Sequence, residues 1–137
     1  MTISFLRTNN PSDIALKFIE NAVKRTPANT AKTQEVIKNI RSNYGDLFLV
    51  LNNYRTTGIV YIHTYYTDNG KVICPVLVGG EKIREWQPNL RTFLIEMKER
   101  TNAFSIDFIA RKGWHKLYPE CRNIGTIYRY TGGSSDK

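Results

Sequence analysis

The sequence predicts a single α/β domain of the α+β type, in which a largely antiparallel sheet packs against helices. Three observations carry this prediction. Apolar residues recur at helical spacing near the N-terminus and again after Pro88, residues 47–78 follow a period of two, and residues 104–130 combine strand, short helix and strand. A chain of 137 residues can bury a core without disulfides or metals. We therefore expect one domain over residues 1–131 and a flexible tail over residues 132–137.

The N-terminal part is expected to form a strand and then two helices. Ile3 to Arg7 is predicted as the strand, and Ser12 as the N-cap of the first helix. One side of that helix is apolar and contains Ile14, Ala15, Phe18, Ile19, Ala22 and Val23. Pro27 and Asn29 end it, and a second helix is expected from about Lys32 to Ser42.

The middle of the chain is rich in β-branched and aromatic residues, which predicts strands over Leu47–Leu51, Thr56–Tyr66 and Lys71–Val78. Asp68-Asn69-Gly70 predicts a tight antiparallel hairpin between the last two strands, because Asn-Gly supplies positive φ angles. Pro75 has no amide hydrogen to donate to a neighbouring strand. We therefore expect the sheet to be bulged or at an edge near Pro75, and to splay there.

The C-terminal part is predicted to hold a third helix and then a strand, helix and strand unit. Pro88 suits the first turn of a helix, and the apolar positions that follow fit the helical template: Leu90, Phe93, Leu94 and Met97. Phe104–Ala110 and Gly125–Thr131 are expected to be strands, because apolar and polar residues alternate there. Lys112–Tyr118 is expected to form a two-turn helix between them.

Composition limits the partners and the compartment. Twenty basic and twelve acidic side chains give a net charge of +8, which favours polyanionic partners such as nucleic acid or the phosphates of a coenzyme. Cys74 and Cys121 lack the spacing of metal ligands, so we expect free thiols in a reducing compartment and no metal site. No stretch has the length of a membrane span or the pattern of a signal peptide, so we expect a cytoplasmic protein without a membrane partner.

The predicted order of elements resembles the GNAT (Gcn5-related N-acetyltransferase) family along nearly the whole chain. The resemblance implies a central mixed, mostly antiparallel sheet with helices on both faces. Many members carry Asn-x-x-Ala-x-x-Leu-Tyr with the tyrosine as general acid, and residues 111–118 lie in register as Arg-Lys-Gly-Trp-His-Lys-Leu-Tyr. Leu117 and Tyr118 match, whereas Arg111 and Trp114 stand in place of the Asn and the Ala. The resemblance thus implies Tyr118 as general acid, and a packed aromatic at the end of a helix is the alternative.

The segment between the fourth strand and the third helix bears on cofactor binding. Family members use Gln/Arg-x-x-Gly-x-Gly/Ala there, so that amides at the helix start hold the coenzyme pyrophosphate. Residues 78–90 contain no such spacing. Gly79 and Gly80 would still permit close approach of the backbone, and Lys82 and Arg84 would meet phosphates by charge.

Other residues of this segment disfavour the binding of an anion. Pro88 removes an amide, and Glu81 and Glu85 place negative charge where a phosphate would dock. We therefore expect no cofactor. Acetyl-CoA is the cofactor that the resemblance implies if the protein is an active transferase.

Two further residues are candidates for catalysis. His63 alternates with Tyr61 and Tyr65 along a strand, where a general base would reach a substrate amine through water. Asp107 shares a strand face with Ser105 and would be a buried catalytic carboxylate. The alternatives are a half-exposed strand histidine, and an aspartate that caps a helix or pairs with an arginine.

The basic excess is concentrated near the C-terminus, where cations and aromatic rings are interleaved. The residues predicted to contact a partner protein or nucleic acid are Arg111, Lys112, Trp114, Lys116, Arg122 and Arg129. Cations beside flat rings suit phosphate contacts and base stacking, and Arg, Trp and Tyr also anchor protein interfaces. A solvated face with core aromatics is the alternative.

Three functions fit these features. The first is a GNAT-like protein without acetyltransferase activity that binds protein or nucleic acid as a phage accessory or virion component, in the host cytoplasm or the virion. The step Arg111–Trp114 is similar to one in small GNAT-like proteins of tailed bacteriophages. The second is an active N-acyltransferase with Tyr118 as acid and His63 or Asp107 as base. The third is a basic nucleic-acid-binding domain. The sequence leaves homo-oligomerisation and the acceptor substrate open.

Overall fold

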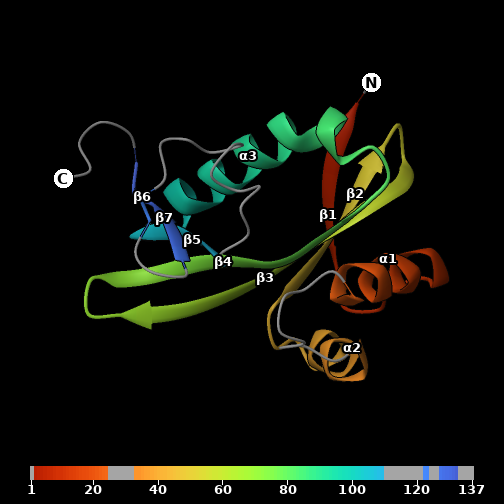
Figure 1. Ribbon diagram of the computed structural model, residues 1–137, viewed down its shortest axis with the longest axis horizontal. Coiled ribbons are helices and arrows are strands. Elements are labelled where there is room, and N and C mark those ends of the chain that lie inside the picture. The colour runs from red at the N-terminus through yellow and green to blue at the C-terminus, as the bar shows by residue number, and fades with distance from the viewer. Residues whose placement is uncertain (1, 25–32, 110–121, 124–126, 133–137) are drawn as a thin grey trace.

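The computed structural model describes residues 2–24, 33–109, 122–123 and 127–132, which form a seven-stranded sheet flanked by helices (Figure 1). The described elements follow in the order β1 (Ile3–Thr8), α1 (Asp13–Lys24), α2 (Thr33–Arg41), β2 (Asp46–Asn52), β3 (Arg55–Thr67), β4 (Gly70–Gly80), α3 (Ile83–Arg100), β5 (Ser105–Ile109), β6 (Arg122–Asn123) and β7 (Ile127–Tyr130). The predicted α+β class is confirmed, although β6 was not foreseen. The helix predicted over Lys112–Tyr118 and the tail beyond Gly132 lie outside the described residues.

The sheet is mixed and mostly antiparallel, with the strand order β1-β2-β3-β4-β5-β7-β6. Every neighbouring pair is antiparallel except β4 with β5, which is parallel. This parallel pairing joins only Val72 to Ser105 and Ile73 to Ile106, although β4 continues to Gly80. The two strands therefore separate beyond Ile73.

Pro75 lies at an irregularity of β4. Its partner on β3 is Ile62, whereas Leu77 pairs with the adjacent Tyr61, so that Val76 is an extra residue in the ladder. The bulge and the separation of β4 from β5 lie within a few residues of each other. Both were predicted from the missing amide hydrogen of Pro75, and both are confirmed.

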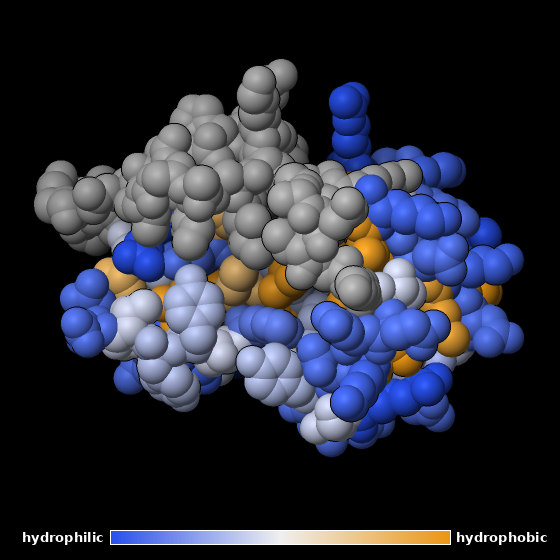
Figure 2. All heavy atoms as spheres, turned by 60° about the horizontal axis from the view of Figure 1, so that its bottom comes forward, coloured by the Kyte–Doolittle hydropathy of each residue, from blue (hydrophilic) through white to orange (hydrophobic). Residues whose placement is uncertain are grey.

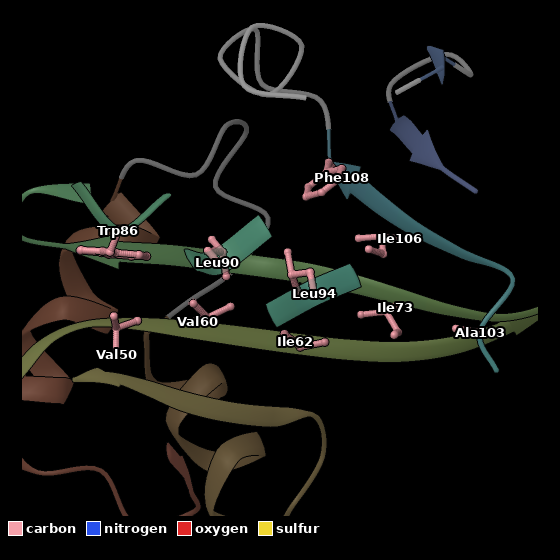
Figure 3. Packing of buried hydrophobic residues seen from close by; sticks show 10 residues of the cluster. All are labelled: Val50, Val60, Ile62, Ile73, Trp86, Leu90, Leu94, Ala103, Ile106 and Phe108. Carbon is pink, nitrogen blue, oxygen red and sulfur yellow. The ribbon is translucent and has the colours of Figure 1, made fainter. Parts of the chain in front are cut away.

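Helices cover both faces of the sheet, with α3 on one face and α1 and α2 on the other (Figure 1). Trp86, Leu90 and Leu94 are spaced four apart and so share one side of α3. They pack on the sheet in the core that Figure 3 shows, together with Val50, Val60, Ile62, Ile73, Ala103, Ile106 and Phe108. Burying each large aliphatic side chain stabilises the fold by about 1.5–3 kcal/mol.

A second core lies under α1 and α2. Its buried residues are Ala15, Ile19, Ala22, Val23, Val36, Ile40, Leu47, Ile59, Tyr61 and Leu77. The predicted N-cap of α1 is confirmed, because the Ala15 amide donates to Ser12 Oγ at 3.4 Å. Ile14 was expected on the apolar side of α1, but it is 54% exposed. The expectation was wrong because Ile14 lies at the rim of that side, beyond the contact with β3 and β4.

Two local predictions need correction. The third helix begins at Ile83, so Pro88 lies inside it and not in its first turn. The hairpin between β3 and β4 does form, but among its turn residues the positive φ belongs to Gly70, at 129°, and not to Asn69. Thr67 pairs with Gly70, which leaves Asp68 and Asn69 as the turn. No helix in the described part of the chain is long and apolar enough to cross a membrane.

Candidate functional site

A line of polar and aromatic residues runs along β3 on the face that carries α1 and α2. Alternation places Tyr61, His63 and Tyr65 on this face, and the register places Cys74 of β4 beside His63. Tyr61 belongs to the core under α1 and α2, and the two residues that follow on this face are partly exposed. Figure 2 turns this side of the molecule forward, and its described surface is mostly hydrophilic, with only scattered hydrophobic areas.

His63 is held by aromatic neighbours. Its Nε2 lies 2.7 Å from the Tyr61 hydroxyl, which in turn donates a hydrogen bond to the backbone carbonyl of Tyr44. The rings of Tyr44 and Tyr61 meet the imidazole edge to face, with centroids 5.2 and 4.7 Å away. Burial lowers the pKa of His63 from its ordinary value, so the ring is neutral near pH 7. A neutral imidazole is the form that accepts a proton.

Gly45 makes this arrangement sterically feasible. It has φ +86°, and a Cβ atom there would lie 2.6 Å from His63 Cδ2 and 2.8 Å from the Tyr61 hydroxyl oxygen. The backbone therefore passes directly against the two rings. Burial, together with the nearby Tyr44 and Asp46, raises the pKa of Tyr61 to about 12. Tyr61 thus keeps its proton throughout the physiological range.

Asp107 forms the second polar group on the same face. Its Oδ1 accepts from Ser105 Oγ at 2.9 Å and from Arg129 Nε at 2.8 Å. Its Oδ2 accepts from the Tyr65 hydroxyl at 2.9 Å and from Arg129 Nη2 at 2.7 Å. Burial alone would raise the pKa of Asp107, but the bonds from Arg129, Tyr65 and Ser105 outweigh it and hold the pKa below its ordinary value.

This geometry favours the structural alternative for Asp107. The carboxylate is fully buried and both of its oxygens are engaged, so a substrate proton would have to displace an existing partner. Arg129 was predicted as a partner-contact residue. It lies instead in this ion pair, with its side chain 21% exposed and its guanidinium also over the Phe104 ring. Its charge is already balanced within the protein.

Cys74 is buried beside His63 in the register, and burial together with Asp107 raises the pKa of its thiol to about 12. It is a free cysteine, and as a protonated thiol it is a poor nucleophile. Among the described residues, no group of three His, Cys, Asp or Glu side chains is placed to hold a metal ion.

The predicted cofactor residues lie at the junction of β4 and α3. Gly79 packs against α1, where a Cβ atom would lie 3.1 Å from Ala22 Cβ. Gly80 has φ +143°, and a Cβ atom there would lie 2.4 Å from Gly58 Cα. Gly80 is therefore required by packing inside the protein and Gly79 is favoured by it, so the two glycines are not evidence for a ligand.

The connection that follows is short and internally bonded. It consists of Glu81 and Lys82, with Lys82 in the left-handed region at φ 52° as the N-cap of α3, without a side-chain cap. The Glu81 amide donates to the Thr57 carbonyl at 2.8 Å, and the Glu81 carbonyl accepts from Trp86 Nε1 at 2.9 Å. Trp86 is 1% exposed. No glycine-rich loop stands before this helix.

The placement of α3 also changes the interpretation of Pro88. Since the helix begins at Ile83, Pro88 lies beyond the first turn and removes none of the amides that an anion at the helix start would use. The argument from Pro88 against phosphate binding was therefore wrong. Glu85 does lie in the first turn, and Arg84 lies beside it. The case against a pyrophosphate site now rests on the short connection and the acidic first turn.

Several predicted residues cannot be placed. Tyr118, Arg111, Lys112, Trp114 and Lys116 lie outside the described residues, and for Arg122 only the backbone of β6 is described. Conversely, sequence reasoning missed Tyr44 and Gly45. The available signal was a glycine directly after an aromatic residue and directly before a strand, which is where a backbone passes closely against side chains.

Comparison with known proteins identifies the fold. A scan against protein-family models and a search of curated proteins give no match. Among solved structures, a GNAT-family acetyltransferase from Staphylococcus aureus is 16% identical over 93% of this chain and 98% of that chain, with a TM-score of 0.66. A predicted acetyltransferase with acetyl-CoA from Clostridium acetobutylicum is 9% identical over 87% and 88%, with a TM-score of 0.62.

A third structure is the catalytic domain of the Tetrahymena Gcn5 histone acetyltransferase in complex with coenzyme A. It is 10% identical over 98% of this chain and 95% of that chain, with a TM-score of 0.62. Identities at this level establish the architecture and leave the activity open. The chain has the GNAT fold, and the structures that share it include enzymes solved with acetyl-CoA or coenzyme A.

Proposed function

We propose that this chain is a GNAT-fold protein that has lost productive acetyl-CoA binding and acts by binding a partner. The observation that carries the proposal is the junction of β4 and α3. A pyrophosphate needs several backbone amides converging on open space. Here the Glu81 amide and carbonyl are both used internally, and the carbonyl is tied to the buried Trp86, whose indole packs against Gly58, where a Cβ atom would lie 2.8 Å from it.

Exposed tyrosines support association as the mode of action. Tyr54 is 92% exposed, Tyr66 76% and Tyr44 64%. Tyrosine is enriched at protein interfaces, because it offers a large contact area with few rotatable bonds and one hydroxyl. The net charge of +8 adds a preference for an acidic partner surface or nucleic acid.

The proposed setting is a bacteriophage, in which the protein is an accessory or virion component. The support is the similarity of Arg111–Trp114 to small phage GNAT-like proteins, together with the size of the chain. The gene neighbourhood tests the setting directly. Portal or tail genes beside this gene support it, and a modification operon contradicts it.

Isothermal titration with acetyl-CoA tests the loss of cofactor binding. We expect no saturable heat at micromolar concentrations. Micromolar binding that the charge reversal Lys82→Glu/Arg84→Glu abolishes would overturn the proposal. The matched control is Lys17→Glu/Lys38→Glu, which changes the net charge equally but lies on α1 and α2, on the opposite face of the sheet.

A second candidate function is an acyl-CoA-dependent N-acyltransferase. The observation that favours it is the separation of β4 from β5 beyond Ile73, next to the bulge at Val76 and on the strand adjacent to His63. An opening between two strands gives an extended ligand a backbone edge to pair with. His63, neutral near pH 7, would serve as the base.

Transfer from radiolabelled acetyl-CoA to poly-L-lysine tests this second function. If it holds, labelling exceeds the buffer background, and His63→Gln lowers it by about 100-fold, the usual size of a general-base contribution. Tyr66→Phe, on an exposed residue three positions further along β3, is the control and should leave labelling unchanged. Background labelling by the wild-type protein would exclude this function for that acceptor.

A further inference from the structure

The bonds around Tyr61 fix where the proton of His63 resides. The Tyr61 hydroxyl lies between two groups, the carbonyl oxygen of Tyr44 and Nε2 of His63. A carbonyl oxygen can only accept, so the single hydroxyl proton of Tyr61 is donated to Tyr44. The Tyr61 oxygen then has only lone pairs to offer to His63. Nε2 must therefore carry a hydrogen for the 2.7 Å contact to be a hydrogen bond.

The surroundings keep this arrangement in one orientation. Tyr61 is 1% exposed and packed in the core under α1 and α2. Gly45 abuts the Cδ2 edge of the imidazole, and Tyr44 meets the ring edge to face. A flipped imidazole would place a carbon atom against the Tyr61 hydroxyl and lose the bond. The ring is therefore held at two edges, Nε2 and Cδ2.

Nδ1 lies across the ring from these contacts. Within the described residues Nδ1 has no hydrogen-bond partner, and His63 is only partly buried. Asp46, whose charge acts on Tyr61, is paired with Arg7 at 2.7 Å. Cys74, beside His63 in the register, holds its proton because burial raises its pKa. Neither group supplies Nδ1 with a proton near neutral pH.

We propose that Tyr61 is a positioning residue that holds neutral His63 as the Nε2–H tautomer, so that Nδ1 is the atom offered to a hydrogen-bond donor of a ligand. The chain of bonds ends at a carbonyl, which cannot pass a proton onward, so it orients the ring and does not shuttle protons. A primary amine or another N–H group is the ligand chemistry that fits. The tautomer does not depend on coenzyme binding, and only its use in catalysis rests on the second candidate function.

Nitrogen NMR of the full chain, labelled with ¹⁵N at histidine, tests the proposal. His115→Gln leaves His63 as the only histidine and so assigns its signals. At pH 8 we expect a pyridine-type shift for Nδ1 and a pyrrole-type shift for Nε2. On acidification the Nδ1 shift should change strongly and the Nε2 shift little, because the proton is added at Nδ1. A pyrrole-type Nδ1, or averaged shifts for both nitrogens in this otherwise wild-type protein, overturns the proposal.

The variant Tyr61→Phe separates positioning from the intrinsic preference of imidazole. It removes the acceptor of Nε2–H, so the two nitrogen shifts should move toward each other as both tautomers become populated. The matched control is Tyr65→Phe, which removes a hydroxyl from the same strand face but one that is bonded to Asp107. Unchanged shifts in a folded Tyr61→Phe protein contradict the proposal. If that variant does not fold, the wild-type shifts still decide.

Discussion

His63 and Asp107 lie on the same face of the sheet, but they differ in burial and in hydrogen bonding. Asp107 is fully buried and receives four hydrogen bonds, from Ser105, Tyr65 and both contacting nitrogens of Arg129. His63 is partly exposed and bonded within the described residues through one nitrogen. A saturated carboxylate stabilises a fold, whereas a ring with one open nitrogen can meet a ligand. The share of a side chain's hydrogen-bonding positions that are already occupied, more than the residue type, thus separates a structural group from a candidate reactive one.

The largest expected effect comes from removing the buried carboxylate of Asp107, which accepts four hydrogen bonds. Asp107→Ala leaves the Arg129 guanidinium without its counter-charge and should lower the free energy of unfolding by about 3 kcal/mol. Urea denaturation at pH 7 measures it. The control is Asp46→Ala, which breaks the exposed pair with Arg7 and should cost less than about 1 kcal/mol. Equal costs for the two variants would contradict the contrast drawn here.

Gly45→Ala should have the next largest effect, because it perturbs His63 through the backbone that packs against the imidazole ring. The new Cβ atom would meet the rings of His63 and Tyr61 at 2.6–2.8 Å, at a residue with φ +86°. The backbone strain alone costs about 1–2 kcal/mol, so a loss of about 2 kcal/mol is expected. Gly132→Ala, at φ +120°, is the control for strain, since the atom closest to its new Cβ among the described residues is Lys98 Nζ at 3.6 Å. Thermal unfolding should show the larger loss for Gly45→Ala.

Tyr65→Phe removes one of the bonds that saturate Asp107. A hydrogen bond to a charged group contributes about 1.5 kcal/mol, and three partner nitrogen and oxygen atoms remain on the carboxylate. We therefore expect a loss of about 1 kcal/mol in urea denaturation. Tyr66→Phe, on the neighbouring and 76% exposed residue, should change stability by less than about 0.5 kcal/mol. No difference between the two would show that the Tyr65 bond is dispensable.

The sequence predicted most of the fold because the period of burial is a local property. The β-branched and aromatic residues of β3 and β4 predict strands, and the helical period of α1 reports which side of that helix faces the core. The start of α3 was missed although Trp86, Leu90 and Leu94 already show the spacing. Proline is most common in the first turn of a helix. The predicted helix start at Pro88 followed this preference, although the apolar pattern begins one turn earlier.

The site was less predictable because it depends on contacts between distant residues. Asp107 was predicted as a candidate catalytic carboxylate, with a helix cap or a pair with an arginine as the alternative. The arginine follows from the β5–β7 register, which sets Asp107 beside Arg129. That register is not encoded in either strand alone. The Tyr44 carbonyl that orients Tyr61 is a backbone atom, and any residue type would supply it. Sequence patterns carry no signal for such a bond.

The smallest expected effect is a difference in pH dependence between the two groups. Burial lowers the pKa of folded His63 below its ordinary value of 6.5, so the unfolded chain takes up a proton there before the folded one does. Stability contributed by neutral His63 is therefore lost as the pH falls below about 6.5. His63→Gln should remove this loss, so that its stability relative to wild type rises between pH 7 and 5 in urea denaturation.

Asp107 cannot produce that change, because its folded pKa lies below its ordinary value of 3.8. Its contribution is complete above about pH 4 and is lost only at lower pH, as the folded carboxylate is protonated. His115 is common to both proteins and cancels in the comparison. Parallel stability curves for wild type and His63→Gln from pH 7 to 5 would mean that His63 is as well hydrated folded as unfolded, and the distinction between a buried base and a surface histidine would fail.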